Sequence, residues 1–318
     1  MFTNFPNGLS SLGIPVLGGL PITSGTYFFV NSSTGDDGNS GLSMDSPLKT
    51  VASAYAKMTT NKFDVCVLMG SSSHALASML TISKNRCIFV GLDGTSRAYG
   101  QRTKLSMGVT TAATDVFAVK NTGIGNVFKN IKFLNANTKA ENVAAFGEGG
   151  EYTVFDSCEF YDSTELDSDT EAEMVLNGDS TQFRNCTFGS LADSVDGNQI
   201  RPAILLTKAT VAAGKVSRDV LFENCNFWKN AGGTTTAMIK GAATDVERVM
   251  EFRNCRFMAN SLGSAPAVAI DVATLTVGQI ITTGSTCSIG CTKTSTAVGV
   301  FNCTPTYVAT ATIGIQST

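Results

Sequence analysis

The chain has 318 residues, a formal net charge of −3, 15% charged residues and 43% hydrophobic residues. This length predicts one or two domains with a sizeable core, and the scarcity of charge excludes a disordered chain. The mild acidity argues against nucleic acid or an anionic membrane as a partner, because both bind clustered Lys and Arg, and no apolar run approaches the ~18–20 residues of a membrane span.

Residues 1–35 contain no charged residue and combine large apolar side chains with Pro and Gly. Pro and Gly exclude a long helix here, and no basic residue precedes Lys49, so a secretory signal is not expected. A solvated tail is one interpretation, but this density of apolar residues is unusual for it. We predict instead that residues 1–25 form an extended arm that binds a partner by strand addition. The predicted partner-binding residues are Phe2, Phe5, Pro6, Leu9, Ile14, Pro15, Val16 and Leu17.

The next segment has the pattern of a cap. Residues 27–31 form an apolar β run, and residues 32–43 are rich in Gly, Asp, Asn and Ser. Apolar residues at spacings of 3, 4 and 7 then predict an amphipathic helix over 47–58, with Ser46 as its N-cap and Pro47 at its first position. One helix placed ahead of a β-rich region would cover an otherwise open core and strand edge.

A six-residue phrase, Phe-x-Asn-Cys-x-Phe in its commonest form, recurs through the middle of the chain. Asn or Ser at its third position predicts a corner, since Asn tolerates the left-handed backbone, and the following Cys and Phe would then point inward. Degenerate copies surround Cys87 and Cys303. The five clear copies start at Phe128, Phe155, Phe183, Phe222 and Phe252.

One strand–corner–strand unit every 27 to 39 residues predicts a solenoid of stacked parallel rungs. Each Phe would lie on the Phe of the next rung and each Cys on the next Cys. The corner residues Asn130, Asn185, Asn224 and Asn254 would stack as a ladder that shares amide hydrogen bonds. Helical repeats lack the required periodicity here, leucine-rich repeats lack their leucines, and propeller blades need a longer repeat.

The nine cysteines have neither the spacing of a disulfide framework nor that of a zinc site, so we predict buried free thiols. At the other end, residues 259–318 carry only Asp271 and Lys293 as charges. An uncharged β-rich surface is hazardous on a free monomer. We therefore predict that a C-terminal β segment, residues 281–318, supports a homotrimer; the alternative is that these strands complete the solenoid.

The stretch from Tyr27 to Val51 and the Asn-Cys-x-Phe phrase resemble right-handed parallel β-helix proteins of the pectate-lyase-like superfamily. The resemblance covers roughly residues 26–260. It implies an all-β fold, a right-handed single-stranded parallel β-helix over residues 26–280 with a capping helix near 47–58. It does not decide the function, because that superfamily contains polysaccharide lyases, hydrolases, phage tailspikes and inert virion proteins.

Groups for catalysis are scarce in the sequence. The densest acidic run lies in an insert between two rungs, and we interpret it as a solvated loop, with calcium binding as the alternative. We assign no catalytic role to His74, interpret residues 147–151 as a turn, and attribute Asp36 and Asp37 to the cap loop. No catalytic, cofactor-binding or metal residue is predicted. The acidic run consists of Glu165, Asp167, Asp169, Glu171 and Glu173.

These observations favour a structural virion protein of a tailed bacteriophage, assembled in the host cytoplasm. The most favoured role is a capsid decoration or head-spike protein, anchored by its N-terminal arm to the capsid or to another virion protein. The alternative is a tailspike-like protein that binds or cleaves a carbohydrate, with a surface glycan as ligand. A bacterial surface adhesin is a weaker third option, because no secretion signal supports it.

Overall fold

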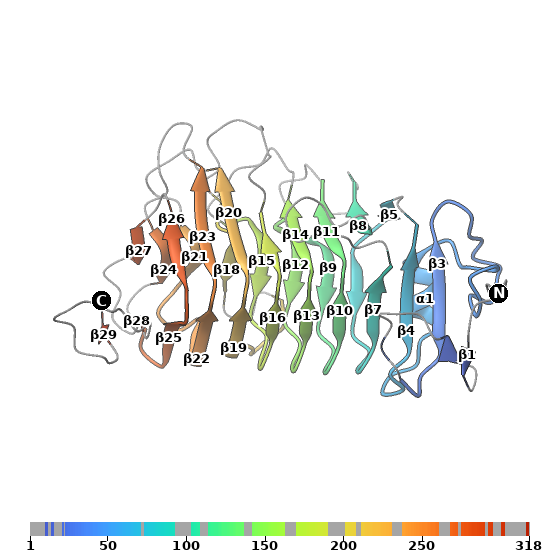
Figure 1. Cartoon of the computed structure of the whole chain (residues 1–318), viewed down its shortest axis with the longest axis horizontal. Helices are drawn as coiled ribbons and strands as arrows, with labels where there is room; N and C mark the ends of the chain where they lie inside the picture. The colour runs from blue at the N-terminus through green and yellow to red at the C-terminus, as the bar shows by residue number, and fades with distance from the viewer. Residues whose placement is uncertain are drawn as a thin grey trace, which may run out of the picture.

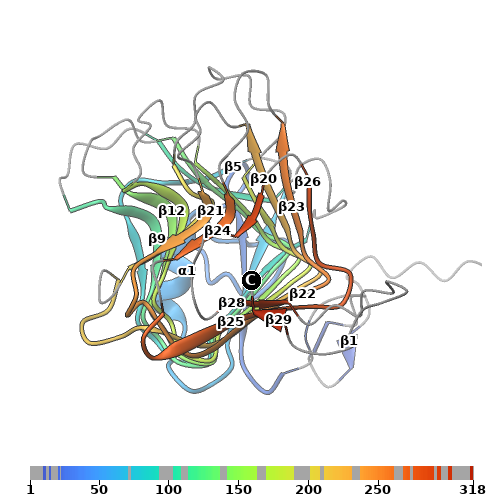
Figure 2. The same cartoon turned by 90° about the vertical axis from the view of Figure 1, so that its left-hand side faces the viewer.

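The computed structural model of the chain describes residues 10–11, 14–15, 21, 23–70, 73–92, 103–108, 114–136, 142–162, 170–189, 201–207, 211–230, 237–260, 268–272, 275–289, 292–294, 300–302 and 316–317. Within these residues the protein is a solenoid, and each full turn of the chain adds one strand to each of three sheets. Figure 1 shows the strands stacked along the long axis, and Figure 2 shows the three sheets end-on. The predicted all-β, right-handed parallel β-helix is confirmed.

The first sheet carries the first Phe of every phrase. Its parallel strands are β3 (Tyr27–Asn31), β4 (Val65–Met69), β7 (Ile88–Gly91), β10 (Val127–Lys129), β13 (Val154–Asp156), β16 (Gln182–Arg184), β19 (Ser217–Glu223), β22 (Val246–Arg253), β25 (Gly278–Thr283) and β28 (Val300–Asn302). A short antiparallel strand, β29 (Gln316–Ser317), pairs with β28. In register, the first Phe of each phrase lies beside the first Phe of the next.

The second sheet carries the last Phe of every phrase. Its strands are β5 (Ser73–Leu76), β8 (Lys104–Met107), β11 (Lys132–Asn135), β14 (Glu159–Asp162), β17 (Thr187–Phe188), β20 (Asn226–Asn230), β23 (Arg256–Asn260) and β26 (Cys287–Ile289).

The third sheet closes each turn. Its strands are β6 (Leu80–Ile82), β9 (Phe117–Asn121), β12 (Ala144–Glu148), β15 (Ala172–Leu176), β18 (Ile204–Leu206), β21 (Ala237–Gly241), β24 (Val268–Val272) and β27 (Thr292–Thr294). Strands β26, β27 and β28 continue the three ladders beyond residue 280.

The chain turns from the first sheet into the second at the predicted corner. Residues at the third position of the phrase have φ between 53° and 56°, in the left-handed region that Asn tolerates. Neighbouring corners are joined by the backbone: the Asn185 N–H donates to the carbonyl oxygen of Glu223 at 2.9 Å. The Asn185 side chain donates to the Asp156 carboxylate at 3.5 Å, and the ladder of shared amide hydrogen bonds stays a prediction. The five corner residues are Asn130, Ser157, Asn185, Asn224 and Asn254.

Two columns of stacked phenylalanine rings fill the core. In the first column the ring centroids of neighbouring rungs lie 4.7–5.2 Å apart. In the second column they lie 4.6–5.3 Å apart, and rings of the two columns meet edge to face. The first column is Phe89, Phe128, Phe155, Phe183, Phe222 and Phe252; the second is Phe133, Phe160, Phe188, Phe227 and Phe257.

The cysteines of the phrase form a third inward column. The Sγ atoms of Cys186 and Cys225 lie 3.5 Å from the carbonyl oxygens of Phe155 and Phe183, respectively. Burial raises the pKa of these two thiols well above its usual value, so they stay protonated and unreactive. The prediction of buried free cysteines is confirmed for the six that the structure describes, Cys66, Cys87, Cys158, Cys186, Cys225 and Cys255.

A short helix, α1 (Val51–Lys57), stands at the N-terminal end of the core, beside β3 and β4 (Figure 1). It starts later than the sequence indicates: Thr50, not Ser46, is the N-cap, and its hydroxyl accepts the Ser53 N–H at 3.2 Å. The physical reason is Leu48, which is fully buried and forms a parallel bridge to Val30. The chain therefore stays extended through this point, and Pro47 lies before the helix. Across the described residues, no helix has the length and apolar character to cross a membrane.

The stacked columns predict a large stability cost for removing one ring. Phe252→Ala removes a ring that stacks on Phe222 at 4.7 Å and is fully buried, so we expect a loss of ~3–5 kcal/mol in the free energy of unfolding. Phe63→Ala is the matched control, since Phe63 is 43% exposed, and its loss should be less than half as large. Chemical denaturation of the three proteins measures both values. Equal losses would contradict the assignment of the columns as the main core.

Candidate functional site

The described part of the predicted arm is short. Phe2, Phe5, Pro6, Leu9, Val16 and Leu17 lie outside the described residues. Ile14 and Pro15 form β2, whose backbone pairs antiparallel with β1 (Ser10–Ser11). The arm therefore contains a short hairpin, and its role in binding a partner stays a prediction.

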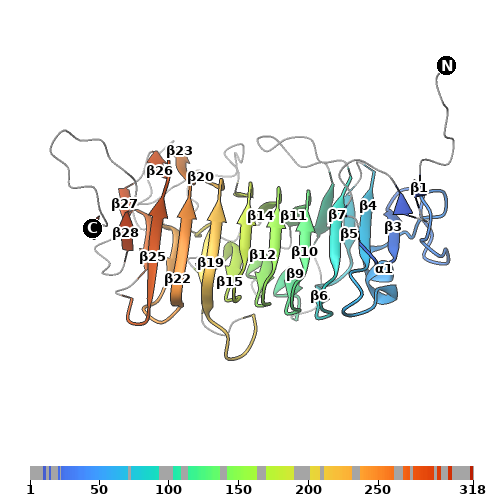
Figure 3. The ribbon, with the colours of Figure 1, turned by 60° about the horizontal axis from the view of Figure 1, so that its bottom comes forward.

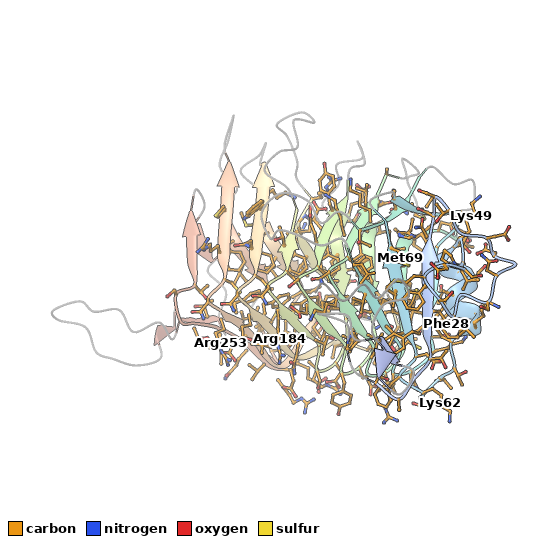
Figure 4. The ribbon with its side chains drawn as sticks, turned by 45° about the vertical axis from the view of Figure 1, so that its right-hand side comes forward. Phe28, Lys49, Lys62, Met69, Arg184 and Arg253 are labelled. Carbon is orange, nitrogen blue, oxygen red and sulfur yellow. The ribbon has the colours of Figure 1, made fainter. Side chains whose placement is uncertain are left out.

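Charges of alternating sign run along the outer face of the first sheet. Register aligns Lys129, Asp156, Arg184, Glu223 and Arg253, one residue for each rung. Lys129 Nζ lies 3.6 Å from Asp156, and the Glu223 carboxylate lies 3.9 Å from Arg184 and 3.4 Å from Arg253. Figure 4 shows Arg184 and Arg253 along this outer side. Each exterior charge thus faces an opposite charge on a neighbouring rung.

A second row of charges follows the corner that leads into this sheet. Arg218 lies between two acids: it pairs with Glu247, and its Nη1 is 3.3 Å from Asp179. The hydrogen bond to Glu247 is the main reason that the pKa of Arg218 is raised. Arg248 pairs with Asp219 at 2.9 Å. These partly exposed pairs each contribute little to stability, but together they leave this face close to electrically neutral.

The middle of the outer face of the third sheet, at Val175 and Leu205, is apolar and covered by the chain itself. Val211 is 3% exposed and packs in one cluster with Val175 and Leu205 of this face. The amide of Asn177 donates to the carbonyl oxygen of Ala212 at 3.3 Å. This turn therefore lies directly on the sheet, where an open groove would otherwise run.

The end of the acidic run is buried, which corrects part of our interpretation of it as a solvated loop. Glu171 and Glu173 are 7% and 3% exposed, and Glu173 lies on β15 between the buried residues Ala172 and Met174. Its carboxylate lies 3.6 Å from Nε of Arg201, which is itself 1% exposed. This buried pair joins two successive rungs, and breaking it would leave one buried charge without its partner. Glu165, Asp167 and Asp169 lie outside the described residues.

A second carboxyl group, that of Glu148, points into the solenoid. The segment 147–151 that sequence alone assigns to a turn begins inside β12, where Glu148 follows the inward Phe146 by two residues. The amide of Asn121 donates to both carboxylate oxygens, at 3.1 and 2.9 Å. The Gly150 N–H and the Thr153 hydroxyl donate to Oε1, at 2.7 and 3.0 Å. Burial nevertheless raises the pKa of Glu148 to about 8.

This raised pKa predicts how stability changes with pH. The unfolded chain has the ordinary value of 4.5, so between pH 4.5 and about 8 the folded protein holds a proton that the unfolded chain has lost. Glu148 therefore makes stability fall as pH rises through this window, by up to ~1.4 kcal/mol per pH unit. Glu148→Gln, which cannot ionise, should flatten that slope in urea unfolding measured at pH 5, 6, 7 and 8. A slope identical to that of the wild type would contradict the assignment.

Exposed aromatic residues mark the corner that leads into the first sheet. The residue three positions before the first Phe of a rung adopts a left-handed backbone, as in Arg86, Tyr152 and Ser180, each with φ 54°. Phe63, three positions before Cys66, has φ 58°. Tyr152 is 63% and Phe63 43% exposed, and the Arg86 guanidinium lies 5.8 Å from the Phe63 ring centre. Bulky residues rarely adopt this conformation, so the corner holds two aromatic side chains outward at an energetic cost.

The other residues considered from the sequence serve the fold. Asp37 accepts hydrogen bonds from the Lys49 and Thr50 N–H groups, at 3.0 and 2.9 Å, and so holds the cap loop. Asp36 accepts the Gly38 N–H at 2.8 Å. His74 is 2% exposed on β5 and lies beside Leu105 in register. Among the residues that the structure describes, no three His, Cys, Asp or Glu side chains are grouped as a metal site.

Comparison with known proteins supports the fold and leaves the activity open. No family model matches the sequence, and no curated protein matches it. Among solved structures, the pectate lyase Pel9A aligns with a TM-score of 0.59 and 13% identity, over 82% of this chain and 63% of that one. A pectin methylesterase in complex with a hexasaccharide gives 0.53 and 13% identity, over 87% and 81%. A rhamnogalacturonan lyase gives 0.52 and 11%, over 83% and 68%. The fold is therefore that of pectate-lyase-like parallel β-helix proteins.

Proposed function

We propose that this chain is a structural protein of a tailed-bacteriophage virion, and specifically a capsid decoration or head-spike protein. In this proposal the β-helix is a rigid rod displayed on the particle, and the N-terminal segment attaches it to the capsid or another virion protein. Assembly takes place in the host cytoplasm, and neither nucleic acid nor membrane is a partner. The rod needs no catalytic group to perform this role.

The observation that carries the proposal is the state of the outer surface. On the first sheet, the exterior charges pair from rung to rung, as Glu223 does with Arg184 and Arg253. On the third sheet, the turn at Val211 fills the space above the strands. The ionisable groups of this row on the first sheet are thus paired with groups of neighbouring rungs, which favours a shape-keeping role.

The two ends of the sequence support attachment and oligomerisation. The arm is uncharged and apolar, and burying one of its large side chains on a partner contributes ~1.5–3 kcal/mol. Ordering its backbone costs a comparable amount over the whole arm, so one arm binds modestly. Three linked arms bind far more tightly through effective concentration. The nearly uncharged C-terminal β segment is the surface through which we expect the trimer to form.

Deletion of residues 2–20 tests the proposal. Full-length protein should copurify with an icosahedral phage particle and scatter light as a trimer when isolated. The truncated protein should keep its β-rich circular dichroism spectrum and lose attachment to the particle. Decoration at full occupancy without residues 2–20 would contradict the anchoring role, and a full-length monomer at micromolar concentration would contradict the trimer.

A second candidate function is binding or cleavage of a carbohydrate, as in a tailspike. The exposed corner of Phe63 and Tyr152 favours it, because outward aromatic faces stack on the apolar faces of sugar rings. These two residues lie three rungs apart, about 14 Å along the solenoid axis. An extended glycan lying parallel to the axis would contact both. The likeness of the fold to pectin-active enzymes is consistent with this candidate.

Glycan arrays and product assays distinguish the two functions. If the corner binds a glycan, Tyr152→Ala and Phe63→Ala should each weaken binding at least tenfold, while Leu42→Ala, an exposed residue of the cap loop, should have no effect. Cleavage of pectic or capsular polysaccharide would appear as reducing ends or unsaturated products. If the intact protein shows neither glycan binding nor cleavage products, this candidate is excluded.

A further inference from the structure

The outer face of the first sheet changes character between β7 and β10. Side chains that point into the core alternate along β3, β4 and β7 with side chains that point outward. From β10 onward one of the two outward rows is charged, and it passes from Val90 to Lys129 in adjacent rungs. The other row passes from Ile88 to Val127 and stays apolar through Val154. The first three rungs are apolar on the outside instead. This outer apolar patch consists of Tyr27, Phe29, Val65, Val67, Ile88 and Val90.

The outer apolar patch is buried although it faces away from the core. Val65 and Val67 are fully buried and Phe29 is 3% exposed. Met44, Met69 and Val127 pack against the cluster, but all three are themselves only partly buried. Lys129, one rung beyond the patch, has a side chain that is 36% exposed. A face of this kind needs a cover, because water contact with so many adjoining apolar side chains is unfavourable.

The chain that leads to this patch comes from the N-terminal segment. The Tyr27 hydroxyl, on the patch itself, donates to the carbonyl oxygen of Pro21 at 2.5 Å. The Thr23 hydroxyl donates to the carbonyl oxygen of Phe63 at 2.8 Å, and the Thr26 N–H donates to Asp64 at 2.8 Å. These bonds place Pro21 and residues 23–26 along the edge of the patch. The chain N-terminal to Pro21 therefore joins the described part of the protein beside the surface that needs covering.

The backbone of the arm agrees with this placement. Figure 2 shows β1 outside the first sheet, and Figures 1 and 3 place it at the end of the solenoid where β3 lies. Packed face to face, two layers of β-structure lie about 10 Å apart, which leaves room for the side chains of both between them. Both surfaces are also free of charge: residues 1–22 contain no ionisable side chain, and the patch has only a tyrosine hydroxyl.

We propose that residues 1–20 dock in cis on the outer apolar patch, so that the arm is a strap on its own β-helix in the isolated protein. The proposal goes beyond the virion role and does not depend on it. If the strap and the virion anchor are both correct, particle binding takes one of two forms. The strap leaves the patch when the particle is bound, or it stays on the patch and binds the particle with its opposite face. A second copy of the chain or a particle surface would be the competing occupants of the patch.

Photo-crosslinking in the isolated full-length protein tests the strap. A benzoylphenylalanine replaces Phe5 in one variant and Leu17 in another, and a ¹⁴N/¹⁵N mixture separates links within one chain from links between chains. Links within one chain to residues 27–30, 65–69 or 88–91 are expected. Links to these residues only between chains, or no links to them, would overturn the proposal. The same probe at Tyr152 is the control and should not reach the patch.

A deletion supplies a second readout. Removing residues 2–20 should expose the patch and raise the fluorescence of the dye ANS several-fold, and a synthetic peptide of residues 1–20 should reverse the rise. Unchanged fluorescence would contradict the strap. Neither measurement involves a particle, so the strap and the virion anchor can fail separately. Links within one chain of the full-length protein support the strap, whatever the truncated protein does on particles. Full decoration of particles by the truncated protein contradicts the virion anchor alone.

Discussion

Each of the five rungs that carry the phrase turns from the first sheet into the second within two residues, and this turn requires one residue with φ near 55°. The left-handed residue reverses the alternation of the strand, so that the Phe before it and the Cys and Phe after it all point inward. Asn occupies the position in four of the five clear copies because its short polar side chain tolerates that backbone. The ring columns, the thiol column and the register of the two sheets all follow from this one conformation.

The second corner uses the same backbone with different consequences. Between the third and first sheets the left-handed position is held by Arg86, Tyr152, Ser180 and Asp219, none of which is Asn. The side chains here point outward, so their chemistry is free to vary while the path of the chain is kept. The interior beside this corner is polar, since Glu148 and Asn121 bond to one another there. The solenoid thus has one corner that is fixed by composition and one that carries surface chemistry.

The fold could be predicted from the sequence because the corner leaves a readable phrase at every rung. The buried thiols and the stacked rings follow from the same phrase. The start of the helix could not be predicted, because Ser46 and Pro47 look like a helix start and only the bridge from Leu48 to Val30 delays it. Glu148 was missed because two glycines beside it indicate a turn, although its spacing of two from Phe146 was an available signal. The outward position of Tyr152 has no such signal, because its left-handed backbone conformation is imposed by the stacking of the rungs and not by its neighbours in the sequence.

The register has a consequence for how such a chain can change over evolutionary time. Backbone hydrogen bonds and ring stacks join each rung only to its two neighbours, and the segments between the second and third sheets differ in length from rung to rung: eight residues separate β11 from β12, and fifteen separate β17 from β18. Insertions at that edge therefore leave the ladders intact. Duplication of a whole rung would lengthen the protein by one strand spacing, about 4.8 Å, without a new core having to be invented. Reach and surface loops can therefore diversify independently in this architecture, provided that each added rung keeps its left-handed corner.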